Sequence, residues 1–460
     1  MRNKKSLWIF LFLLATSVVL SGCGKETVAT YKINLEVWGV FDDSDVYSDL
    51  FTEYKKVNPF IGNISYRKLD PETYKEDLVN AMASGNGPDI FMIRNTWVDA
   101  FRDKTVSAPG AVVSEKILRD HFVDVVAEDF LMSDGTVAAL PFSVDSLGLY
   151  YNKDILNAAG ISRPPTTWEE LISLIPRFTR IDEFGNITQS AVALGTAYNV
   201  NRSTDILLAL AYQKGADIRS EGFNQSGMNE AFDFYTQFAR SSSSQYTWNP
   251  RLHFSIDAFY EGKTAMMLNY SWHYQTIRQK NAKFNFGVAS LPQFASGKTV
   301  NFANYWGYAV AKNKTQPQNP TGDIKMLPTD QYQAVRTHES WQLLAYLMLP
   351  HPEKTFVVQN ALSGTTKIFP IQNDPTVAYL DATKKPAARR DLLEGEKADL
   401  QLAPFALGNL IARSWKPGNP EAVETIVAEG IDSVNRGERS LSEALSVMTN
   451  RSAQFRVNNR

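Results

Sequence analysis

The sequence predicts an α/β fold divided into more than one lobe, and three observations support this prediction. Strand-like and helix-like stretches alternate between residues 33 and 93, which is the pattern of an α/β layer. The chain has 460 residues, more than one hydrophobic core usually serves. With 44% apolar residues and a single cysteine, its stability must come from the size of the core rather than from disulfides.

The first strand and the first helix follow from the spacing of apolar residues. Residues 33–38 alternate apolar and polar side chains, which predicts a strand. Residues 44–57 are predicted to form a helix, because five apolar residues fall on one of its faces: Val46, Leu50, Phe51, Tyr54 and Val57.

Turn and capping residues predict the next three elements. Residues 64–69 are expected to form a strand that stops at Asp70 and Pro71, an N-cap followed by a first helical residue. The helix that begins there should end in the Ser-Gly-Asn-Gly-Pro run of residues 84–88. Residues 89–93 then predict an apolar strand buried on both faces, as a parallel sheet requires.

The N-terminus has the layout of a secretory signal peptide. Three cations (Arg2, Lys4 and Lys5) precede a 14-residue apolar run at residues 7–20. That run is shorter than the roughly 20 residues of a membrane-spanning helix. A cleaved export signal is therefore expected rather than a membrane span.

The apolar run ends in Leu20-Ser21-Gly22-Cys23, which resembles the lipobox of bacterial lipoproteins. The resemblance implies that residues 1–22 are a signal peptide and that Cys23 becomes an acylated N-terminus. Residues 23–30 would then be the lipid anchor and its tether. We expect the protein to be exported and anchored to the outer face of the cell membrane, or to face the periplasm.

The charge of the chain argues against a nucleic-acid partner. The formal net charge is −2, and removal of the three cations of the signal peptide leaves −5. The chain also has no block of lysine and arginine, so it lacks the basic surface that nucleic acids need. No later run of 18 apolar residues predicts a second membrane segment.

Several motifs, taken in their order along the chain, carry a resemblance to a known family. They lie at residues 87–90, 139–154, 159–161, 164–171, 262–267 with Trp272, 287–289, 306–307 and 440–445. In this order they resemble the extracellular solute-binding proteins of ATP-driven sugar importers, the maltose-binding-protein-like group. The resemblance spans nearly all of residues 31–450.

The resemblance implies a fold and a set of partners. The fold would be an α/β, two-lobed, periplasmic-binding-protein-like fold of type II, with the lobes joined by a hinge of several crossovers. Lobe one would hold residues 31–142 and 292–375, and lobe two residues 143–291 and 376–450. The partners would be a carbohydrate, an ABC-type permease and the membrane. The protein would act as a monomer without a cofactor, and it would not be an enzyme.

Most candidate ligand-binding residues lie at the ends of strands, because ligands of α/β sheets bind beyond the carboxyl ends of the strands. Asp145 lies at the first crossover, Trp306 precedes a strand, and Trp415 lies before the last helices. Aromatic rings there suit the C–H faces of a sugar, and amides and charged groups suit its hydroxyls. Trp272 and Asp145 also match positions that contact sugar in the resembled group. The full set of candidates is Trp38, Arg94, Asn95, Trp97, Asp145, Asn199, Tyr270, Trp272, Trp306 and Trp415.

Other functions remain open at this point. Relatives of this architecture bind polyamines or glycerophosphodiesters, and Arg94 or Arg413 would have to face the cleft for the latter. A secreted glycoside hydrolase needs two carboxylates across the cleft, and only Asp145 is a candidate by position. A sensory or adhesive lipoprotein is a third possibility. The sequence contains no G-x-S-x-G or H-E-x-x-H motif, and its five histidines have no i, i+4 partner, so no catalytic or metal site is expected.

Overall fold

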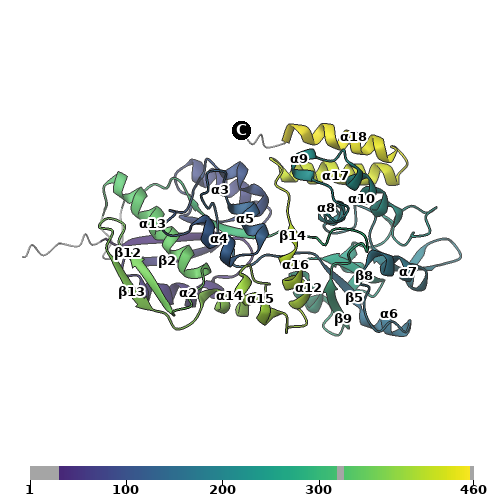
Figure 1. The fold of residues 1–460 in the computed structure, drawn as a ribbon, viewed down its shortest axis with the longest axis horizontal. Coiled ribbons are helices and arrows are strands. Elements are labelled where there is room, and N and C mark those ends of the chain that lie inside the picture. Colours follow the sequence, from purple (N-terminus) through teal and green to yellow (C-terminus); the bar gives the residue numbers. More distant parts are fainter. Residues whose placement is uncertain (1–30, 319–325, 456–460) are drawn as a thin grey trace, which may run out of the picture.

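The computed structural model describes residues 31–318 and 326–455 and contains two α/β lobes lying side by side (Figure 1). The expected signal peptide, Cys23 and its tether lie outside the described residues. Within the described ranges, no helix is both long and apolar enough to cross a membrane.

The first lobe is built on a five-stranded sheet. Its strand order is β2-β1-β3-β11-β4, with β1 parallel to β2 and β3, and β11 antiparallel to β3 and β4. The strands are β1 (Ile33–Gly39), β2 (Ile61–Lys68), β3 (Ile90–Arg94), β4 (Thr105–Val106) and β11 (Trp306–Ala311). The helices that share this core are α2 (Ser44–Val57), α3 (Tyr74–Ala83), α4 (Glu115–His121), α5 (Asp124–Phe130), α13 (Thr329–Met348), α14 (Pro375–Thr383) and α15 (Arg390–Glu396).

The second lobe repeats this plan around another five-stranded sheet, of order β6-β7-β8-β5-β9. Its strands are β5 (Gly148–Asn152), β6 (Arg180–Ile181), β7 (Ile187–Ala193), β8 (Thr264–Asn269) and β9 (Phe286–Ser290). Its helices are α6 (Lys153–Ala158), α7 (Trp168–Phe178), α8 (Ser203–Gln213), α9 (Ile218–Glu221), α10 (Ser226–Gln237), α11 (Ser255–Tyr260), α12 (His273–Lys280), α17 (Pro420–Asn435) and α18 (Leu441–Ser452).

Short elements complete the structure. Strands β10 (Asn301–Phe302) and β14 (Ala412–Arg413) pair in parallel, and helix α16 (Ala403–Leu410) contributes to both cores. Strands β12 (Thr355–Gln359) and β13 (Thr366–Pro370) form a separate antiparallel hairpin. Figure 1 shows β14 and α16 between the two lobes.

The sequence-based elements of the first lobe are largely confirmed. Helix α2 spans the residues expected from its apolar face, and β3 is buried over most of its length, as its apolar run requires. The expected start of α3 at Pro71 is wrong, since the helix begins at Tyr74. Asp70 accepts a hydrogen bond from the backbone N–H of Glu72 at 2.9 Å and so holds a turn before the helix.

Packing corrects the expected lobe boundaries in two places. Phe294 lies in the core of the second lobe, where its ring centroid is 5.0 Å from that of Phe234, although lobe one was expected to begin at residue 292. Tyr379 lies in the core of the first lobe, stacked on Phe142 at 4.0 Å, although lobe two was expected to begin at residue 376. The lobe to which each ring belongs is decided by the ring against which it packs. The order of the segments in the sequence does not reveal these packing partners.

Within residues 31–318 and 326–455, the chain passes from one core to the other in three places. The passages lie between Val144 and Leu147, between Phe302 and Ala303, and within residues 393–423. Residues that follow the strands of both sheets, together with these crossovers, form the candidate site.

Candidate functional site

Trp272 is the most exposed aromatic candidate, and its position is fixed by neighbouring side chains. It lies between β8 and α12, keeps 38% of its surface exposed, and stacks on Tyr270 with ring centroids 4.8 Å apart. The Tyr270 hydroxyl donates to Asp205 Oδ2 at 2.8 Å. The indole is therefore a preformed flat apolar surface held by a buried hydrogen bond.

Asp145 joins the first crossover to the loop that carries Trp272. Its carboxylate accepts hydrogen bonds from the Ser271 backbone N–H at 3.0 Å and from Ser271 Oγ at 2.6 Å. Burial raises the pKa of Asp145 to about 7, and the hydrogen bonds from Ser271 oppose that shift. Asp145 thus fixes the position of the residue next to Trp272.

A chain of polar contacts continues from Asp205 into the first lobe. Asn304 Nδ2 donates to Asp205 Oδ2 at 3.1 Å, and Arg94 Nε donates to Asn304 Oδ1 at 3.3 Å. Arg94 also forms an ion pair with Glu424 of α17 at 2.8 Å. These contacts connect the end of β3 with α8, the second crossover and α17.

The aromatic residues of the first lobe form a row that begins in solvent and ends in the interior. Phe41 is 45% exposed and meets Trp306 edge-on, with ring centroids 5.4 Å apart. Trp306 in turn meets Trp97 edge-on at 5.0 Å. Trp306 also sits opposite Arg94 in the register of β11 and β3, so this row borders the polar chain.

The structure places two of the predicted residues away from this assembly. Trp38 is buried and donates to Glu36 Oε1 at 2.7 Å, with Arg67 over its ring. Asn199 is also buried, and its amide donates to the backbone carbonyls of Asn249 and Leu252. Both side chains stabilise their own lobes.

Asn95 and Trp415 lie near the assembly, at the interface of the lobes. The buried Asn95 amide donates to Asp129 at 2.9 Å. Trp415 meets Phe223 edge-on and lines a cavity of about 20 Å³, whose walls include Arg94, Asn304 and Glu424. That volume holds about one water molecule.

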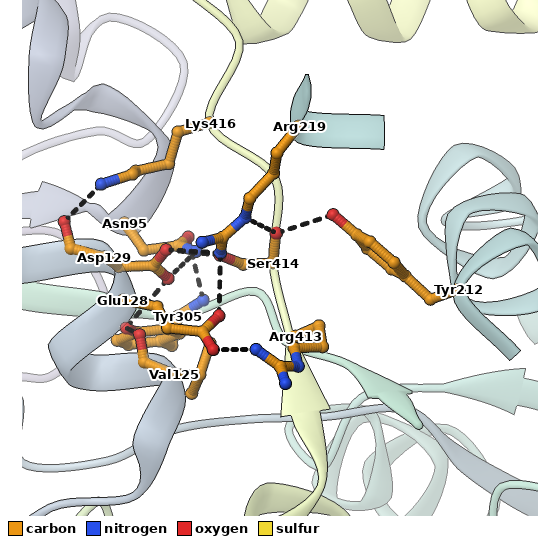
Figure 2. Close-up of polar contacts among 10 residues, drawn as sticks. All are labelled: Asn95, Val125, Glu128, Asp129, Tyr212, Arg219, Tyr305, Arg413, Ser414 and Lys416. Atoms are coloured by element: carbon orange, nitrogen blue, oxygen red, sulfur yellow. Dashed lines mark hydrogen bonds and ion pairs between the residues drawn. The ribbon is translucent and has the colours of Figure 1, made fainter. Parts of the chain in front are cut away.

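A second group of contacts joins the lobes around Asp129 (Figure 2). Asp129 lies on α5 and accepts hydrogen bonds from Asn95, Tyr305 and Ser414. Arg219 of α9 forms an ion pair with Glu128 at 3.1 Å and donates through Nε to the Ser414 carbonyl at 3.0 Å. Helices of both lobes and the segment after β14 therefore meet at one polar cluster.

Sequence reasoning missed several residues of the site. Asp205 is the only acid in α8, which is otherwise apolar or uncharged, and that contrast could have marked it. Glu421 and Glu424 carried no such signal, because acids are common in the first turns of helices. Their contacts with the first lobe link residues more than 300 positions apart.

Comparisons with known proteins agree with this architecture. Residues 44–325 match the model of a family described as bacterial extracellular solute-binding protein. The maltotriose-binding protein of Pyrococcus abyssi is 23% identical over 350 residues, which cover 73% of this chain and 66% of that protein. The maltodextrin-binding protein MdxE of Bacillus subtilis is 29% identical over 198 residues, covering 40% of this chain and 44% of that protein. The chain thus spans less than two thirds of either relative.

Solved structures of similar proteins agree over nearly the whole chain. The sugar-binding protein MalE of Xanthomonas citri superposes with a TM-score of 0.69 at 19% identity, covering 92% of this chain and 97% of that one. A cyclo/maltodextrin-binding protein complexed with maltotetraose also gives 0.69, at 16% identity, covering 94% and 100%. The expected two-lobed fold, of the type II periplasmic-binding-protein kind, is confirmed.

Proposed function

The chain belongs to the bacterial extracellular solute-binding proteins, and from that premise we propose that it captures a carbohydrate, specifically an oligosaccharide, between its two lobes. The observation that carries this proposal is the indole of Trp272, which keeps 38% of its surface exposed and is held by Tyr270 beside the buried carboxylate of Asp145, with the Arg202 guanidinium 5.8 Å from its ring centroid. The proposed ligand residues also include Arg94 and Trp306, which the polar chain through Asn304 and the register of β11 connect to the site, whereas the fully buried Tyr270 supports the indole from beneath.

This combination of groups suits a sugar. The faces of a pyranose ring carry C–H groups that stack on aromatic rings, and each stack contributes about 0.5–1.5 kcal/mol beyond the burial of area. Each well-made hydrogen bond to a hydroxyl adds about 0.5–1.5 kcal/mol net. A handful of such contacts gives a micromolar Kd, which corresponds to about −8 kcal/mol.

The names of the relatives support an oligosaccharide. They include a maltotriose-binding protein, a maltodextrin-binding protein and a structure complexed with maltotetraose. The alternative of a glycerophosphodiester needs an arginine free to bind phosphate. Arg94 is paired with Glu424 and Arg413 with Glu128, so the structure favours the carbohydrate.

The proposal predicts a response to sugars in solution. Addition of a bound oligosaccharide from a broad panel is expected to change tryptophan fluorescence, because Trp272 would be covered. It should also compact the protein in small-angle scattering, since a ligand that contacts both lobes favours their closure. The same mixtures should contain no new sugar products. If no sugar in the panel changed either signal, the carbohydrate proposal would be wrong, and product formation would favour a glycoside hydrolase.

We further propose that the protein is anchored through Cys23 and delivers its ligand to an ABC-type permease. A tether from residue 24 to residue 30 spans at most about 25 Å, which keeps the ligand site close to the membrane. Cys23→Ala is therefore expected to leave the Kd for sugar unchanged and to reduce uptake by cells. Labelling with radioactive palmitate and an uptake assay test both parts, and equal loss of binding and uptake would contradict the anchor.

A further inference from the structure

Glu421 and Glu424 lie on α17 of the second lobe and reach across to the first lobe. We propose that these two residues, with Lys75 and Arg94, form an end wall that limits the length of the carbohydrate that the site accepts. The inference rests on the proposed function. It concerns how far a sugar chain can extend along the aromatic row of the first lobe.

The aromatic row shows where a longer ligand would run. Phe41, Trp306 and Trp97 follow one another through edge-on contacts, which gives three successive rings on one lobe. Phe41 is open to solvent and Trp306 is half-buried, whereas Trp97 keeps only 6% of its surface exposed. The row therefore continues beyond the part that a sugar can reach.

Side chains of both lobes cover Trp97. Its Nε1–H donates to Glu421 Oε1 at 2.8 Å, and Lys75 Nζ lies 4.9 Å from the ring centroid. Lys75 also pairs with the other carboxylate oxygen of Glu421 at 3.0 Å. The ion pair between the lobes thus holds the indole at its edge and screens part of it, while Tyr74 and Phe101 pack against it in stacked orientation within the first lobe.

The second ion pair of the wall extends this closure along α17. Glu424 lies three residues after Glu421, so both carboxylates project from one face of the helix. Glu424 pairs with Arg94 at 2.8 Å. Both residues line the cavity of about 20 Å³, which has room for about one water molecule and none for a sugar ring. The wall therefore closes this end of the site.

The wall can be removed without loss of the fold. Lys75 and Glu421 are 42% and 45% exposed, and an ion pair so open to solvent contributes little to stability. Arg94 is only 11% exposed, and after removal of Glu424 it keeps its hydrogen bond to Asn304. The apolar residues that hold α17 in its lobe, including Val423 and Val427, are unaffected. Glu429 offers a matched control, since it lies on the same helix but forms its ion pair with Arg451, a residue of the same lobe.

The test compares the wild-type protein with the double variant Glu421→Ala/Glu424→Ala, with Glu429→Ala as control. The probes are linear maltose oligomers from two to seven units, titrated by calorimetry. For the wild type, the Kd is expected to fall with oligomer length at first and then to stay constant for the longer oligomers. In the double variant, the longer oligomers should bind about fivefold to tenfold tighter than in the wild type, the gain of one more aromatic stack. Glu429→Ala should behave as the wild type.

Trp97 supplies a readout that does not depend on the ligand. Acrylamide should quench more tryptophan fluorescence in the double variant than in the wild type, and addition of Trp97→Phe should abolish this difference. Trp97→Phe should also reduce the gain for the longer oligomers. Equal titration series in wild type and double variant, or unchanged quenching, would refute the wall and leave the carbohydrate proposal intact. If no oligomer bound to either protein, the proposed function would fail and the wall with it.

Discussion

Trp272→Ala is expected to raise the Kd for the bound carbohydrate by about tenfold to a hundredfold, which corresponds to about 1.4–2.7 kcal/mol. The exposed part of the indole is the surface against which a sugar ring would pack, and its removal takes away both this contact and the buried area. Isothermal titration calorimetry with the best sugar of the panel gives the change in Kd directly.

The fold should tolerate this substitution. Trp272 keeps more than a third of its surface exposed, and Tyr270 beneath it remains fixed by Asp205. Phe184→Ala is a suitable control, because Phe184 is also an exposed aromatic residue. It lies in the turn before β7, whereas the loop that leads to α8 leaves the opposite end of that strand. A Kd that changed equally in both variants, or in neither, would contradict the role of Trp272.

The second large effect concerns stability and pH. Burial raises the pKa of three carboxyl groups, Asp145, Glu339 and Glu396, to about 7 in the folded protein. A carboxyl group whose pKa is higher in the folded than in the unfolded state binds more protons when folded. The contribution of these three groups to the free energy of unfolding should therefore fall as the pH rises from about 4.5 to about 7, and it should stay low above that range.

Glu339→Gln isolates one of these groups. Glu339 is buried and accepts hydrogen bonds from Tyr31 and from Asn58. Glutamine stays neutral at every pH, so the variant should gain about 2–3 kcal/mol relative to the wild type at pH 8 and little at pH 5. Urea denaturation at the two pH values measures the difference. The exposed Glu72→Gln is the control, and parallel pH profiles of wild type and Glu339→Gln would show that Glu339 does not carry the effect.

The sequence-based expectations agree best with the structure where the local conformation depends on residues close together in the sequence. At Thr167, for example, the glutamate three residues later (Glu170) is a pattern that predicts a helix cap. The Thr167 hydroxyl indeed accepts the Glu170 backbone N–H at 3.1 Å, at the start of α7. The prediction for α3 failed because Asp70 bonds within a turn, which is another local structure that its side chain permits.

The candidate site was predictable only in part. Trp272 and Asp145 were identified from motifs, and the structure links them through Ser271. Trp38 lies near the end of β1 and Asn199 follows β7, yet both are buried within their own lobes. A position after a strand does not tell which way a side chain points, because that depends on the segments packed around it.

By itself, then, the sequence determined the α/β class, the family, the main elements of the first lobe and the exposed tryptophan after β8. These features depend on the periodicity of apolar residues, on capping residues and on motifs, each of which involves residues close together in the sequence. Only the tertiary structure decided that Arg94 pairs with Glu424, that Glu421 covers Trp97, and that Tyr379 belongs to the first core. Arg94 and Glu424 are 330 residues apart, and such a contact depends on how two independently patterned lobes meet.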